Sequence, residues 1–102
     1  MKYNELTKIM ECEYSIRIKD KQDVIDFLVK TGTPSKLFHN EPIHWDVIAD
    51  TVSLDAGFRV FDKTIVIYKK EVDPNLIMNL NVLNITNERG EIVVYLGYER
   101  NH

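Results

Sequence analysis

The densest group of side chains that could do chemistry spans residues 39–46, with the sequence His-Asn-Glu-Pro-Ile-His-Trp-Asp. Two imidazoles and two carboxylates so close together could ligate a metal ion or exchange protons. A structural zinc site needs a full tetrahedral ligand set, often with two ligands one turn apart on a helix, but Pro42 interrupts the segment between His39 and His44. We therefore expect a polar loop with no metal, no cofactor and no catalytic residue. His44 and Asp46 are the pair to test for a chemical role.

Trp45 allows two interpretations. With His44 and Asp46 beside it, the indole could line a pocket for a small ligand, as in a sensor domain. Alternatively, Pro42 suits a first helical turn and the following apolar residues repeat at helical spacing, which predicts a helix that buries Trp45 in the core. The repeating positions are Trp45, Ile48, Ala49 and Val52.

Cys12 is the single cysteine, so no internal disulfide can form. Its neighbours Glu11 and Glu13 repel the thiolate that a nucleophile requires. Near the first residue the chain lacks the apolar stretch of a secretory leader, and no apolar run approaches the ~18 residues of a membrane span. We therefore expect a cytoplasmic protein that has no membrane partner.

The charge balance is mildly acidic, with 13 Lys and Arg against 16 Asp and Glu and a net charge of −3. This balance gives no electrostatic reason to bind nucleic acid, so we expect no nucleic-acid partner. Isoleucine, lysine and asparagine, which have AT-rich codons, are abundant, and only two alanines occur. That composition indicates an AT-rich genome, such as that of a low-GC bacterium, a phage or a mobile element.

The hydrophobic pattern predicts one α+β domain over residues 1–102, with a single mainly antiparallel sheet and two to three helices. The expected order is αβααββββ, and Asp20 is expected to be the N-cap of the second helix. For residues 75–80 two readings stay open: a strand with a β-bulge near Val82, or a short helix before the strand. The expected elements are helices over 3–11, 21–31 and 42–52, and strands over 13–19, 58–61, 64–70, 80–86 and 91–98.

Two of the expected strands, residues 64–68 and 92–96, are apolar on both faces instead of alternating. One set of side chains should pack under the helices, and the other needs a second cover, since monomers seldom expose large apolar patches. We predict that a symmetric homodimer or a protein partner supplies it, with self-association favoured. The predicted interface residues are Val66, Tyr68, Val93 and Tyr95. The predicted function is a small non-catalytic protein-binding module of the accessory, inhibitor or immunity type.

Two further stretches, residues 57–68 and 96–102, resemble the sheet and tail of the RelE-like ribonuclease toxins. The resemblance covers roughly half the chain and implies RNA cleavage. The residues that it puts forward are Arg59, Lys63, Arg100 and His102. The chain departs from that family in being acidic, and in having a long segment between Tyr68 and Glu91 where the family has a short turn.

Overall fold

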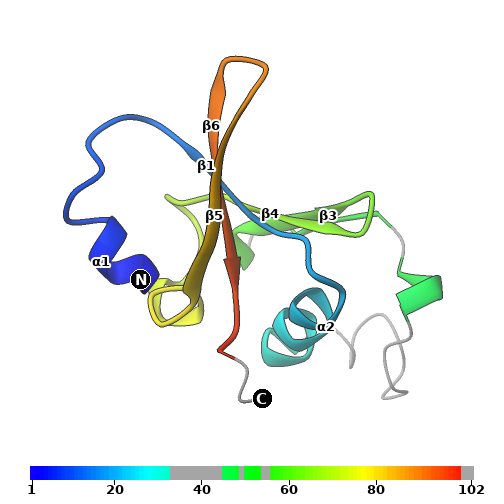
Figure 1. The fold of residues 1–102 in the computed structure, drawn as a ribbon. Helices are drawn as coiled ribbons and strands as arrows, with labels where there is room; N and C mark the ends of the chain where they lie inside the picture. The colour runs from blue at the N-terminus through cyan, green and yellow to red at the C-terminus, as the bar shows by residue number, and fades with distance from the viewer. Residues whose placement is uncertain (33–44, 49, 54–55, 100–102) are drawn as a thin grey trace.

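The computed structural model describes residues 1–32, 45–48, 50–53 and 56–99 of the chain. In these ranges a six-stranded sheet carries two α-helices, α1 (Tyr3–Leu6) and α2 (Lys21–Lys30), so the predicted α+β class is confirmed (Figure 1). Single turns of 3-10 helix lie at Trp45–Val47 and Pro74–Leu76. The strands are β1 (Ser15–Ile18), β2 (Thr51–Ser53), β3 (Phe58–Phe61), β4 (Thr64–Ile67), β5 (Asn81–Glu88) and β6 (Glu91–Gly97).

The sheet is mixed, with the strand order β2-β3-β4-β1-β6-β5. Strand β1 lies in the middle, antiparallel to β4 and parallel to β6. The remaining neighbours, β2–β3, β3–β4 and β5–β6, are antiparallel. A mainly antiparallel sheet was expected; the parallel pairing joins residues from the two ends of the chain and could not be inferred from local pattern.

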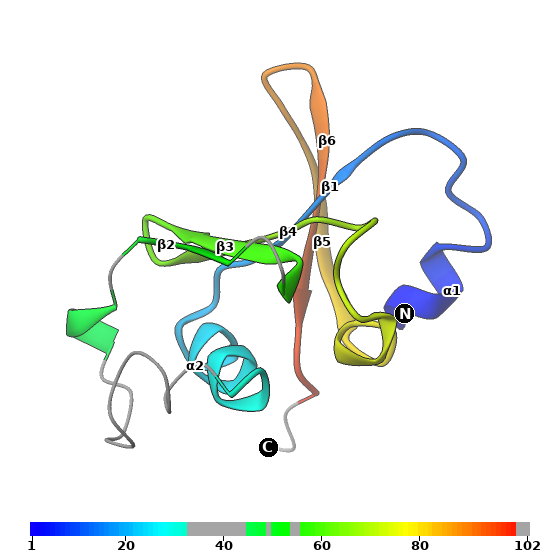
Figure 2. The ribbon, with the colours of Figure 1, turned by 180° about the vertical axis from the view of Figure 1, so that it is seen from behind.

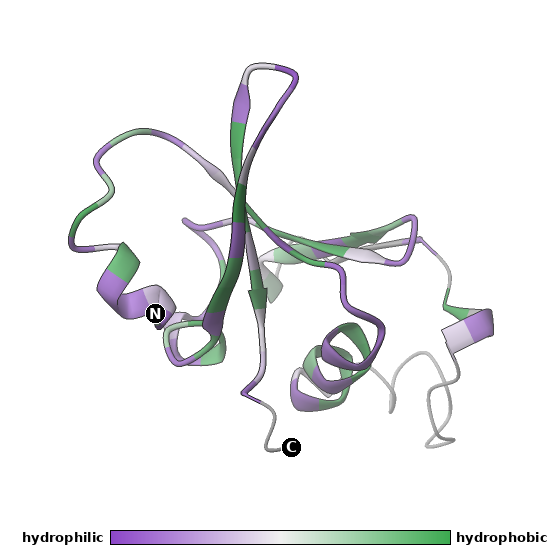
Figure 3. Cartoon of the chain, in the orientation of Figure 1, coloured by the Kyte–Doolittle hydropathy of each residue, from purple (hydrophilic) through white to green (hydrophobic). Residues whose placement is uncertain are grey.

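One face of the sheet packs against the helices and forms the core. Ile16 and Ile18 of β1 are fully buried on this face, together with Phe27 of α2. The rings of Phe27 and Phe58 meet edge to face at 5.1 Å between centroids. Figure 2 shows α2 beneath β3 and β4, and Figure 3 shows the hydrophobic stretches of the strands above it.

Helix α2 begins and ends as its sequence predicts. The Asp20 carboxylate accepts hydrogen bonds from the backbone N–H groups of Gln22 and Asp23, which would otherwise lack partners. Gly32 follows the helix with a φ of +76°, the left-handed conformation of a C′ glycine. The buried Asp23 carboxylate accepts from the Tyr98 N–H at 3.2 Å, so the helix also holds the end of β6.

The other predicted helices differ from the structure. Helix α1 ends at Leu6 instead of near residue 11, and Ile9 is 67% exposed. Where a helix was expected to reach residue 52, the chain forms β2, in which Thr51 pairs with Val60. Strand pairing with β3 therefore overrides the helical spacing. The start of that expected helix lies outside the described residues.

Two-residue turns close the β3–β4 and β5–β6 hairpins, between strands that the sequence predicted, although β5 runs to Glu88 and so ends later than expected. Asp62 and Lys63, and likewise Arg89 and Gly90, have positive φ at both central positions, as type I′ turns require. In β5 the pairing register shifts between Val82 and Asn84, which places a β-bulge where one of the two readings put it. The strand reading of residues 75–80 is wrong, however, because a 3-10 turn occupies Pro74–Leu76 and β5 begins only at Asn81, so a short helix before the strand is the nearer of the two readings.

Candidate functional site: the open face of the sheet

The face of the sheet opposite the core is the candidate site, and we call it the open face. Register places one row of residues straight across it: Arg59 pairs with Val66, Val66 with Arg17, and Arg17 with Tyr95. In Figures 1 and 2 both described helices lie on the other side of β3 and β4 or beside the lower part of the β5–β6 hairpin. No described helix covers the open face.

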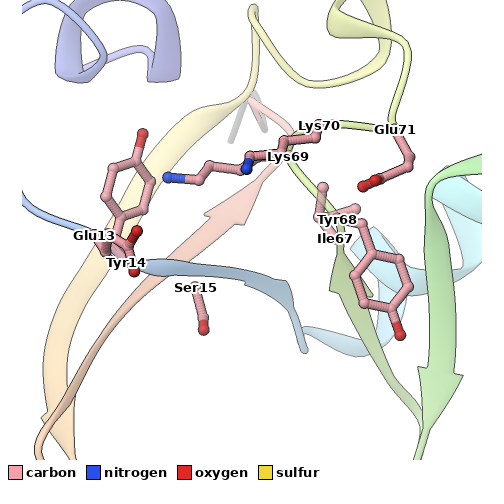
Figure 4. Close-up of a pocket in the computed structure, with 8 residues that line it drawn as sticks. All are labelled: Glu13, Tyr14, Ser15, Ile67, Tyr68, Lys69, Lys70 and Glu71. Carbon is pink, nitrogen blue, oxygen red and sulfur yellow. The ribbon is translucent and has the colours of Figure 1, made fainter.

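The structure brings the four predicted interface residues to this one face. Val66 and Tyr95 lie in the row described above, while Val93 pairs with Ser15, and Ser15 lines the same hollow as Tyr68. Figure 4 shows the side chains of Ser15 and Tyr68 directed to the same side. Alternation separates the two faces within each strand, and the pairing of Val66 with Arg17 and of Arg17 with Tyr95 brings the two sets to the same face.

The four residues do not form an exposed apolar patch, however. Val93 is 0% exposed and Tyr95 6% exposed, although neither belongs to the main core cluster. Val66 and Tyr68 are half-buried. Polar neighbours on the same face supply part of the cover, so the expectation that the second apolar set lies bare until a partner covers it needs correction at Val93 and Tyr95. Whether they take part in an interface stays a prediction.

A hydrogen-bonded cluster holds Tyr95 against the sheet. Its hydroxyl donates to Oε2 of Glu88 at 2.5 Å, and the Thr86 hydroxyl donates to the same oxygen at 2.6 Å. The ammonium of Lys19 lies 4.2 Å from the centroid of the Tyr95 ring. Because Tyr95 pairs with Asn84 and its hydroxyl reaches Glu88 near the turn, the ring runs along the strand past Val93. This path accounts for the burial of Val93.

These contacts lower the pKa of the Glu88 carboxyl and raise the pKa of the Tyr95 hydroxyl. The hydrogen bonds from Thr86 and then Tyr95 hold the pKa of the Glu88 carboxyl below its ordinary 4.5, and the charges of Arg17 and Lys19 act in the same direction. The bond to Glu88, with burial, raises the pKa of Tyr95 above its ordinary 10.0. Glu88 is therefore ionised and Tyr95 is protonated at neutral pH.

The lowered pKa of Glu88 predicts a loss of stability in acid. A carboxylate with a folded-state pKa below its unfolded one contributes stability above the unfolded pKa, and the contribution is lost as pH falls through the folded value. We expect the urea midpoint of the wild type to fall more between about pH 6 and about pH 3 than that of Glu88→Gln, which is uncharged throughout. Glu11→Gln, at an exposed carboxylate, is the control and should follow the wild type. Parallel curves for the wild type and Glu88→Gln would contradict the assignment.

Two arginines flank Val66 on the open face and were not predicted as part of the interface. The Nε atoms of Arg17 and Arg59 are both buried, with no hydrogen-bond partner among the described residues. Arg59 lies over the ring of Phe61, its guanidinium carbon 5.3 Å from the centroid, and Phe61 is 56% exposed. The ion pair found within the described ranges, between Lys2 and Glu99, is elsewhere. Alternation along β1 and β3 could have placed both arginines on this face.

A hollow of about 320 Å³ opens at the ends of β1 and β4 (Figure 4). The Lys69 ammonium lies 3.7 Å from the centroid of the Tyr14 ring, and the Tyr14 hydroxyl is 2.9 Å from that of Tyr3. Its described contacts thus hold side chains in place and join no nucleophile to a base. The lining residues are Glu13, Tyr14, Ser15, Ile67, Tyr68, Lys69, Lys70 and Glu71.

A second hollow, of about 490 Å³, includes Trp45 from the predicted ligand site. Trp45 is half-buried against the edge of the core, and the Lys63 ammonium lies 5.4 Å from its ring centroid. Asp46 is exposed, and His44 and His39 lie outside the described residues. The small-ligand prediction therefore keeps Trp45 and stays a prediction. The lining residues are Lys19, Asp20, Lys21, Trp45, Leu83, Asn84, Tyr95 and Leu96.

Within the described ranges, no three His, Cys, Asp or Glu side chains gather as a metal site requires. None of the described helices is long and apolar enough to cross a membrane. Of the residues put forward by the ribonuclease resemblance, Arg59 lies on the open face and Lys63 lies over Trp45, whereas Arg100 and His102 lie outside the described residues. That resemblance stays untested by the geometry.

Comparison with known proteins gives no relative for the chain. No family model, no curated protein and no solved structure matches it.

Proposed function

We propose that the protein is a small non-catalytic protein-binding module that binds through the open face of its sheet, as a homodimer or with another protein. One observation carries the proposal: aromatic and arginine side chains interleave on a sheet face that no described helix covers. Phe61 and Arg59 are the most characteristic of these, because aromatic residues and arginine are the types most enriched at binding hot spots.

The biological setting belongs to the same proposal. A compact α+β domain of 102 residues with AT-rich composition fits the accessory, inhibitor and immunity-type proteins of bacteria, phages and mobile elements. A small-ligand sensor is the second candidate, supported by the hollow that Trp45 and Tyr95 line together.

The mass in solution at rising concentration tests self-association through the open face. We expect light scattering to give a mass above the 12.0 kDa of one chain for the wild type and for Ile9→Ser, and a return to one chain for Phe61→Ser. Ile9 is the matched control, because it is a similarly exposed apolar residue after α1. Phe61 suits this test better than the buried Tyr95, whose loss would disturb the fold. An assembly that survives Phe61→Ser would place the binding surface elsewhere.

A further inference from the structure

The open face carries Arg59 on β3 and the carboxylates of Glu88 and Glu91 at the far end of the β5–β6 hairpin, and Arg17 and Lys19 lie between them, close enough to act on Glu88. Arg59 belongs to β3, and no described carboxylate lies within ion-pair distance of it. Glu88, the last residue of β5, pairs with Glu91, the first residue of β6, beside the turn. The Glu88 carboxylate already accepts hydrogen bonds from the hydroxyls of Thr86 and Tyr95. Glu91 is exposed, and its carboxylate accepts a hydrogen bond from the Ser15 hydroxyl. One chain thus carries on the same face a cation that has no carboxylate partner among the described residues and an accessible carboxylate.

The end of the hairpin also projects beyond the rest of the sheet. Strands β5 and β6 are eight and seven residues long, against four for β1, β3 and β4. Strand β1 pairs with β6 only from Val93 to Tyr95, so the hairpin end has no further neighbour on that side within the described part of the chain. Figures 1 and 2 show the hairpin standing away from β3 and β4. Glu88 and Glu91 therefore lie at the projecting tip of the β5–β6 hairpin, which we call the hairpin end. Arg59 lies on the open face of β3 and β4, which we call the platform.

We propose that the open face binds a second copy of the chain, with the hairpin end of each copy seated on the platform of the other. Glu91 of one copy pairs with Arg59 of the other, and the hairpin end covers the exposed ring of Phe61. A two-fold axis makes this contact twice, since in such an interface residue i meets j and j meets i. Arginine suits the pairing because its guanidinium forms two parallel hydrogen bonds with a carboxylate. The inference rests on the proposed function and specifies its partner and contacts.

Charge reversal tests the pairing. Arg59→Glu alone and Glu91→Arg alone each place like charges together twice in a dimer, and each should weaken the dimer by at least about tenfold. An equimolar mixture of the two variants restores both pairs within a mixed dimer, so sedimentation should show recovery on mixing. Lys8→Glu, an exposed site after α1, is the control and should leave the dimer unchanged. Circular dichroism of each variant confirms that the fold is retained.

The outcomes separate the pairing from the wider proposal. A dimer that resists both reversals but is lost in Phe61→Ser overturns the Arg59–Glu91 pairing while the protein-binding function stands. Two weakened variants that do not recover on mixing also overturn the pairing. A wild type that stays monomeric overturns the second copy as partner. In that case, a shift of the Arg59 Nε–H signal in nuclear magnetic resonance on adding polyglutamate would assign an acidic protein to the platform instead.

Discussion

Replacing Phe27 with alanine is expected to lower the free energy of unfolding by about 3–5 kcal/mol. The ring is fully buried between α2 and the sheet and meets Phe58 edge to face. Its removal both forfeits burial and leaves a cavity that a close-packed core fills only in part. A single domain is commonly stable by about 5–15 kcal/mol, so the loss is a large share of the total. Urea unfolding followed by circular dichroism measures it.

Val29→Ala is the matched control for Phe27→Ala. Val29 lies on the same helix but is 57% exposed, so its truncation should change stability by no more than about 0.5 kcal/mol. Equal effects of the two substitutions would show that α2 does not pack on the sheet through Phe27.

Gly57→Ala is expected to have the second large effect. Gly57 has a φ of +81°, and a Cβ atom there would lie 2.3 Å from the backbone of Val72. The left-handed conformation costs an alanine about 1–2 kcal/mol, and displacing the opposing backbone costs about 1–3 kcal/mol more. The Tyr68 N–H also donates to the Gly57 carbonyl at 2.8 Å, so the backbone cannot move away without losing a hydrogen bond.

Two other glycines separate the conformational cost from the steric one. Gly32 and Gly90 have φ values of +76° and +80°, but a Cβ atom at either would meet nothing within 4 Å. Gly32→Ala and Gly90→Ala should therefore cost only the first part, about 1–2 kcal/mol. If Gly57→Ala costs no more than these two in urea unfolding, the close approach of Val72 is not maintained in solution.

Local signals predicted the elements whose causes are local. The cap at Asp20 and the extent of the helix that follows it depend on residues within a few positions of one another, and both were predicted. Strand β2 was not, because the helical spacing from Trp45 to Val52 competes with pairing to β3, in which Thr51 pairs with Val60 and Ser53 with Phe58. The partner is close in sequence, but the helical period of the apolar residues gives no sign of it.

The candidate site was predictable only in part, because only some of its features depend on local sequence. Alternation grouped Val66, Tyr68, Val93 and Tyr95 on one face, and the structure keeps them there. Alternation could not show that Glu88, seven residues before Tyr95, would accept a hydrogen bond from the tyrosine hydroxyl and so hold the ring against the sheet. Arg59 is opposite Val66 in the β3–β4 hairpin, whose two strands were predicted, whereas the closeness of Arg17 to Val66 required the strand order, which local pattern does not give.

The central position of β1 also has a consequence for how the chain is made. Ile16 pairs with Val94, so one side of a strand synthesised early stays unpaired until the last strand leaves the ribosome. Contacts between such distant residues require a large loop to close, which slows folding. During that interval the unpaired edge of β1, which includes the apolar residues Ile16 and Ile18, can pair with another nascent chain. The order of synthesis therefore exposes β1 to aggregation until β6 arrives.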